Sequence, residues 1–230
     1  MTEQRVTLSD LPRGIYDHSQ HSKLSDRAMR RYHPFAFDFD STPFSLEDPK
    51  PSWDEEAVKR HLESRERVID GLRMEYGARR IAQIVEDVRE LGPKPFSFIA
   101  HHNRLADQAR RAFIGGAYFP ALVSACALGE RMLNHMILDL REDYTASPYY
   151  RKVRGRKSFD NWSFAVEVLK DWKVLIDGVG DDFLSLAALR NRSIHFNLET
   201  YRTLRGDALI ALKTLFRIAS TQFGWFGRQP

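Results

Sequence analysis

The decisive stretch of this 230-residue chain is Leu189-Arg190-Asn191-Arg192-Ser193-Ile194-His195-Phe196, which follows an apolar run beginning at Phe183 with the spacing of a helix. A His exchanges a proton near neutral pH, and an Arg binds phosphate oxygens and stabilises charge as a phosphodiester breaks. Arg190 and His195 together therefore suit chemistry on a phosphodiester. The same spacing also fits a solvated helix end, whose cations face the negative end of the helix dipole.

The stretch resembles the Arg-x4–6-His motif of the HEPN superfamily, in which a polar residue, here Asn191, usually follows the Arg. Upstream segments are similar to the paired core helices of that family. They show small residues around a Gly turn and then an alanine-rich helix that ends in an apolar stretch containing Glu. These segments are Leu105–Ala109, Gly116–Ala121 and Ala127–Leu133. The resemblance covers roughly residues 98–222.

The resemblance implies a metal-independent endoribonuclease that serves as a toxin or an antiviral defence effector. Within it, His195 is the general base or acid at the ribose 2′-OH or the leaving oxygen, and Arg190 stabilises the phosphorane-like transition state. Asn191 orients His195 or the phosphate. The resemblance also implies RNA as substrate, a homodimer or higher oligomer with a composite site at its interface, and an antitoxin or defence-system partner protein. A non-catalytic helical adaptor or oligomerisation module stays open, as does an RNA- or nucleotide-binding sensor.

Helix geometry bears on how this site is assembled. Residues five apart on an α-helix differ in direction by about 140°, so Arg190 and His195 do not share a face, whereas Asn191 and His195 do. One helix alone would form a poor site. Either the helix ends before His195, or a two-fold symmetry mate supplies the second half, which the resemblance favours.

Composition limits the class of protein. Hydrophobic residues make up 43% and charged residues 29%, as in soluble globular proteins, and no apolar run reaches transmembrane length. The N-terminus lacks the layout of a secretory signal, and the single Cys126 excludes an internal disulfide, so we expect a cytoplasmic protein without membrane contact. Cys126 lies in an alanine-rich helix, which favours a buried thiol over a nucleophile. The net charge of +4 requires any RNA binding to use a local patch.

A basic segment with neighbouring tyrosines supplies such a patch. The range 144–157 is expected to be a loop, and cations beside aromatic rings suit single-stranded or looped RNA. The alternative is an ordinary solvated loop. The predicted RNA-binding residues are Arg151, Lys152, Arg154, Arg156, Lys157 and, within the motif, Arg192.

The chain as a whole predicts an all-α protein. Strand-like alternation, Gly-rich phosphate loops and Cys/His metal spacings are absent from the sequence, so neither a cofactor nor a metal is expected. We expect an irregular aromatic and proline-containing arm over residues 1–51, a bundle of five or six helices over 52–222, and a tail over 223–230. The expected helices span about 52–91, 98–114, 121–143, 159–175, the motif helix, and 200–222.

Local signals refine these boundaries. Ser52 begins a capping box with Glu55, and Gly71 and Gly77 are candidate breaks in the first helix. Asp181 is the expected cap of the motif helix. The adjacent His101 and His102 point about 100° apart, which favours surface or capping roles over a shared metal.

Overall fold

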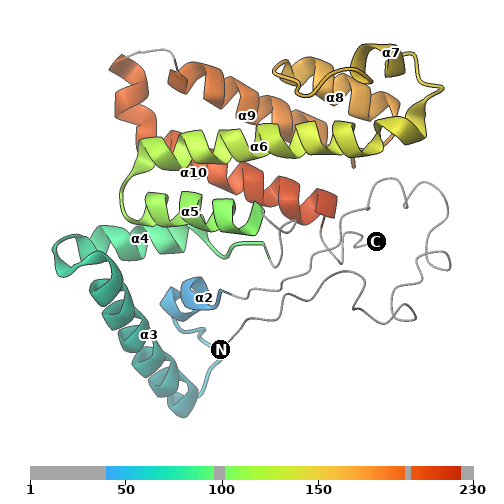
Figure 1. The fold of residues 1–230 in the computed structure, drawn as a ribbon. Helices are drawn as coiled ribbons and strands as arrows, with labels where there is room; N and C mark the ends of the chain where they lie inside the picture. Colours follow the sequence, from blue (N-terminus) through green and yellow to red (C-terminus); the bar gives the residue numbers. More distant parts are fainter. Residues whose placement is uncertain (1–39, 96–101, 195–197, 224–230) are drawn as a thin grey trace, which may run out of the picture.

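The computed structural model describes residues 40–95, 102–194 and 198–223, and their regular structure is helical, without a strand (Figure 1). The all-α prediction is confirmed. In chain order the elements are α2 (Thr42–Leu46), α3 (Glu55–Tyr76), the 3-10 turn η3 (Ala78–Arg80), α4 (Ile81–Leu91), α5 (His102–Ile114), α6 (Tyr118–Leu140), the 3-10 turn η4 (Arg141–Tyr144), α7 (Tyr150–Val153), α8 (Trp162–Asp171), α9 (Val179–Ile194) and α10 (Leu198–Phe223).

Helix α6 lies at the centre of the bundle and packs against α5, α8, α9 and α10 (Figure 1). Its apolar positions recur with helical spacing, and 11 of them are buried, from Ala121 to Leu140. Pro120 lies in its first turn, where the missing N–H leaves no partner unsatisfied. Because so many residues of α6 are buried, its polar positions are few, and two of them, Glu130 and Asn134, contact residues outside the helix.

The N-terminal helices form a separate small cluster beside the bundle. Leu46, Leu72, Ile84 and Val88 are buried together with Ile114 of α5. Helix α3 extends away from the bundle (Figure 1), and Leu72 is the one buried residue among its 22. The part of the expected arm between residues 40 and 51 contains α2, whereas residues 1–39 lie outside the described ranges.

Three local expectations are corrected by the structure. The N-cap of α3 is Asp54, whose carboxylate accepts from the Ala57 N–H at 2.7 Å, so the predicted capping box at Ser52 is wrong. Helix α3 runs through Gly71 and ends at Gly77, whose φ of 87° favours glycine. Helix α9 begins at Val179, which places Asp181 inside the first turn rather than at the cap.

The predicted loop 144–157 is also partly helical, since it includes the end of η4 and all of α7. The expected surface role of His102 is wrong, because the residue is 3% exposed and its ring lies edge-on to His135 with 5.3 Å between centroids. Its neighbour His101 lies outside the described residues. None of the described helices combines the length and apolar composition that a bilayer crossing needs.

A buried carboxylate joins α4 to the bundle. Asp87 is 0% exposed, and its Oδ1 accepts from Arg205 Nε and Nη2 at 2.9 and 2.7 Å, and from Gln83 at 2.9 Å. Its Oδ2 accepts from the Tyr118 hydroxyl at 2.9 Å. Burial would lower the pKa of Arg205, but its hydrogen bonds to Asp87 and Glu90 raise that pKa above the ordinary value. The carboxylate is therefore fully paired, as a buried charge requires.

Replacing Asp87 by Ala is expected to destabilise the fold by about 1–3 kcal/mol, because Tyr118, Gln83 and Arg205 lose a buried acceptor, although Arg205 keeps Glu90 as a partner. Urea unfolding followed by circular dichroism measures this change. The control is Glu86→Ala, one position away on the exposed side of α4, for which we expect a change within about 0.5 kcal/mol. Equal stability of the two variants would contradict the prediction.

Candidate functional site

The end of α9 is positioned by a close approach between α9 and α6. At Gly129 of α6, an added Cβ would lie 2.8 Å from Leu186 Cδ1 and 3.2 Å from the Trp162 ring, so only glycine fits without a shift. Cys126, one turn earlier, donates to the Leu186 carbonyl at 3.6 Å. Arg190 lies one turn after Leu186 on the same face of α9, so it faces Glu130, the residue after Gly129.

Glu130 pairs with Arg190. The distance from Arg190 Nε to Glu130 Oε2 is 3.4 Å, and the two side chains are 33% and 25% exposed. Neither terminal nitrogen of Arg190 donates a hydrogen bond to another described residue. The ion pair therefore contacts the guanidinium at Nε and leaves both terminal nitrogens without a partner in the described chain, and an Arg can bind two phosphate oxygens with such nitrogens.

The neighbours of Arg190 differ in what holds them. Asn191 is exposed, and its side chain makes no hydrogen bond with another described residue. Arg192 forms an ion pair with Asp207 of α10, and the arginine side chain remains 54% exposed while the carboxylate is 7% exposed. Ser193 is buried and donates to the Arg190 carbonyl at 2.9 Å. The pair between Arg192 and Asp207 thus fastens the end of α9 to α10.

His195 lies outside the described residues, as do Phe196 and Asn197. The structure places Arg190 and Asn191 but does not test whether His195 meets them. Helix α9 is described to Ile194 and α10 from Leu198, and the two run in different directions (Figure 1).

The predicted basic segment is a held surface rather than an open loop. All five of its cations are exposed: Arg151, Lys152, Arg154, Arg156 and Lys157. Arg141 at the end of α6 donates to the carbonyls of Arg156 and Val153 at 2.8 and 3.4 Å. The Arg156 guanidinium lies 5.6 Å from the centre of the Phe164 ring. Backbone and one side chain of the segment are therefore fixed by α6 and α8.

The hydroxyl groups of the tyrosines in this segment are bound by acidic side chains of neighbouring elements. The Tyr149 hydroxyl donates to Glu167 at 2.7 Å and the Tyr150 hydroxyl to Glu142 at 2.8 Å. These hydrogen bonds to carboxylates raise the pKa of both phenols above the ordinary value. The Tyr149 ring also packs edge-on against Phe164. Electrostatic contact by the cations remains the chemistry that this surface offers.

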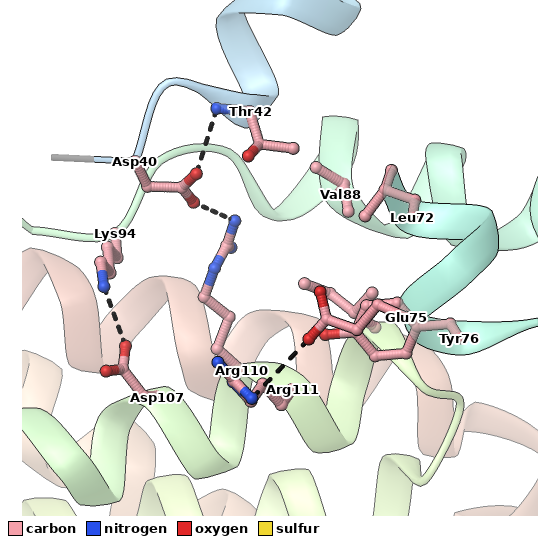
Figure 2. Close-up of a pocket in the computed structure, with 11 residues that line it drawn as sticks. Asp40, Thr42, Leu72, Glu75, Tyr76, Val88, Lys94, Asp107, Arg110 and Arg111 are labelled. Atoms are coloured by element: carbon pink, nitrogen blue, oxygen red, sulfur yellow. Dashed lines mark hydrogen bonds and ion pairs between the residues drawn. The ribbon is translucent and has the colours of Figure 1, made fainter. Parts of the chain in front are cut away.

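A cavity of about 310 Å³ lies where the N-terminal helices meet α5 (Figure 2). Three ion pairs line it, and each joins α5 to a different element: Arg110 with Asp40, Asp107 with Lys94, and Arg111 with Glu75. Arg110, which is buried, points from α5 toward Asp40 in Figure 2. Because the acidic and basic side chains that line the cavity cancel in pairs, the cavity offers no excess positive charge to an anion. It marks the boundary between the N-terminal cluster and the helical bundle.

Nucleophilic and metal-dependent chemistry find little support in the described part of the chain. Burial raises the pKa of the Cys126 thiol to about 12, so the thiol stays protonated at neutral pH, and the expected structural role is confirmed. Among the described residues, no three His, Cys, Asp or Glu side chains come together as metal ligands. The two carboxylates at the end of α9, Glu130 and Asp207, are each paired with an arginine.

Comparisons of this chain with protein-family models, with curated proteins and with solved structures find no match. The fold and the geometry of the residues therefore have to carry any functional proposal.

The sequence did not identify the residues of α6 that organise this region. Glu130 and Asn134 are polar positions in a largely apolar helix, and Arg141 is the residue at its C-cap; they contact Arg190, the Phe159 backbone and the basic segment respectively. At about 100° per residue, positions 4 and 11 residues after Glu130 differ from it in direction by about 40° and 20°. In the sequence, polar residues that recur on one side of an otherwise apolar helix were the signal that could have identified these positions.

Proposed function

We propose that this protein is a metal-independent endoribonuclease of HEPN type, in which Arg190, Asn191 and His195 act on RNA. A toxin or antiviral defence role, with an antitoxin or defence-system protein as partner, belongs to the same proposal. One observation carries it: Arg190 is held through Nε by Glu130 while its two terminal nitrogens have no partner among the described residues. This pre-organisation suits a group that stabilises charge in a transition state.

Two further observations support the proposal. Asn191 is exposed beside Arg190, so an amide can reach the same phosphate or orient an imidazole. His195 follows Ile194, the last described residue of α9, by one peptide bond, which brings a group that can exchange protons to the same end of the helix.

A non-catalytic helical adaptor is the second candidate. It is favoured by the pairs of Arg190 with Glu130 and Arg192 with Asp207, because ordinary packing of α9 against its neighbours explains both arginines. Incubation of the purified protein with labelled single-stranded RNA distinguishes the two functions. Cleavage at enzyme concentrations below that of the RNA supports the nuclease, whereas intact RNA after prolonged incubation supports the adaptor.

The nuclease proposal includes a homodimer, and one surface of α6 fits that role. Phe119 and Val123 are 50% and 36% exposed, and they lie within about 40° of Glu130 around the helix axis. This apolar stripe therefore leads along α6 toward Arg190. A second copy of the chain packed here would bring two Arg190 side chains toward one cleft.

Val123→Arg is expected to shift the protein from dimer to monomer and to reduce RNA cleavage in parallel, since a buried unpaired charge opposes association. Light scattering at working concentration gives the mass. Met74→Arg serves as the control, because Met74 is 89% exposed on α3 and a charge there meets only solvent. A parent protein that is strictly monomeric and fully active would remove the dimer from the proposal.

A further inference from the structure

We infer that the basic segment 151–157 and Arg190 contact one and the same RNA strand, and that the protein therefore requires a single-stranded substrate of at least about five nucleotides. The inference rests on the proposed function and specifies its substrate. It is carried by three polar residues that form a stripe along one side of α6 and its C-cap: Glu130, Asn134 and Arg141.

The first step is that α6 sets the direction between the two sites. Glu130 contacts Arg190, and Arg141 donates to the carbonyls of Val153 and Arg156, which lie on either side of Arg154-Gly155. Because positions 130 and 141 differ by only about 20° around the axis, both contacts lie on the same side of α6. Figure 1 agrees, since α7 and α9 both lie on one side of α6, α7 near its C-terminal end.

The second step is that the connection is fixed. Between the two ends, Asn134 bonds the Phe159 backbone in both directions: its amide donates to the Phe159 carbonyl at 2.9 Å, and its carbonyl accepts from the Phe159 N–H. The Phe159 side chain is 2% exposed. The chain leaving the basic segment is therefore anchored to the stripe of α6 one turn from Glu130, so the distance between the cations and Arg190 is set by the fold.

The third step is the distance itself. Eleven residues of α-helix, from Glu130 to Arg141, span about 16 Å at roughly 1.5 Å per residue. A stacked strand advances about 3.4 Å along its axis for each nucleotide, so about five stacked nucleotides cover that span. Asp160 is exposed between the two ends and repels phosphate there. We therefore place the phosphate contacts at the two ends of the stripe.

The basic segment 151–157, which lies at the Arg141 end of the stripe, has side chains that suit a phosphate backbone. Arg151, Arg154 and Lys157 are exposed, and their charged groups form no ion pair with a described residue. Such cations release counterions when they bind phosphates, which gives affinity without base preference. The hydroxyls of Tyr149 and Tyr150 are bound by Glu167 and Glu142, so the exposed cations supply the polar contacts with phosphates here.

The test measures affinity for 2′-O-methyl RNAs of two to ten nucleotides by fluorescence anisotropy, because these RNAs bind without being cleaved. For the parent protein we expect affinity to rise steeply at about five nucleotides. The variant carries Arg151→Gln, Arg154→Gln and Lys157→Gln. It should match the parent on two- and three-nucleotide RNAs, lose at least about tenfold on ten-nucleotide RNA, and show a salt slope smaller by about 2.

The control removes three cations elsewhere: Lys59→Gln, Arg67→Gln and Arg79→Gln, all exposed on α3 and η3. It should follow the parent at every length. Equal weakening of the basic-segment variant at all lengths, or no weakening at ten nucleotides, would overturn the inference. A different outcome would contradict the proposed function: the parent protein binds these RNAs but leaves the matching 2′-hydroxyl RNAs intact.

Discussion

Arg190→Ala and His195→Ala are each expected to lower the rate of RNA cleavage by at least about 10²–10³-fold, the usual cost of removing one group that stabilises a transition state. Arg190 has two terminal nitrogens with no partner in the described chain, and the proposed function assigns the proton transfer to His195. Single-turnover cleavage of a labelled RNA measures the loss, because it reports the chemical step without product release.

The fold should survive the substitution at Arg190, since a partly exposed ion pair with Glu130 contributes at most about 1 kcal/mol. Thermal unfolding therefore separates lost chemistry from lost structure. Arg67→Ala, an exposed arginine on α3, is the matched control and should cleave like the parent. Glu130→Gln keeps the shape of the side chain but removes the charge that orients Arg190, so an intermediate loss is expected. Cleavage at the parental rate by both primary variants would show that the catalytic interpretation is wrong.

Local patterns predicted the elements of this fold well where one helix determines its own extent. The 3.6-residue period and Pro120 located α6, and the apolar run from Phe183 located α9. Gly77 ends α3 because its positive φ costs a glycine little. The cap of α3 was misassigned because Ser52 and Asp54 both suit an N-cap, and only the direction of the incoming chain selects Asp54.

Contacts across long sequence separations could not be predicted in this way. Arg190 meets Glu130 across 60 positions, and Arg205 meets Asp87 across 118. Each pairing depends on how the helices pack, not on the spacing within either helix. The same limit applies to His102, whose burial against His135 is a consequence of α5 packing on α6. The motif therefore predicted the candidate site residues, whereas the packing of the helices determined which partners these residues contact.

The second large effect expected is on the products of cleavage. Two carboxylates reach the end of α9 in the described chain, and each is paired with an arginine rather than open to a cation. A Mg²⁺ site usually uses carboxylates together with phosphates. We therefore expect cleavage to persist in excess EDTA. In the proposed mechanism the nucleophile is the ribose 2′-OH of the substrate itself, and no metal-bound water takes part.

In that mechanism the 2′-oxygen bonds to the adjacent phosphorus while its proton passes to a neutral His195, and the bond from phosphorus to the 5′-oxygen breaks as a protonated group donates to the leaving oxygen. A dimer supplies two His195 side chains that can divide these roles. Arg190 stabilises the extra negative charge on the phosphorane-like oxygens, and Asn191 orients the phosphate or the imidazole.

The products must then carry a 2′,3′-cyclic phosphate and a 5′-hydroxyl, which mass spectrometry of the fragments identifies directly. DNA and RNA with a 2′-O-methyl group at the scissile position should resist cleavage completely, because the attacking oxygen is absent or blocked. The rate should peak between the pKa of the base and that of the acid, since one group must start neutral and the other protonated. Fragments with a 5′-phosphate, or activity lost on chelation and regained with Mg²⁺, would rule out this mechanism even for a chain that cleaves RNA.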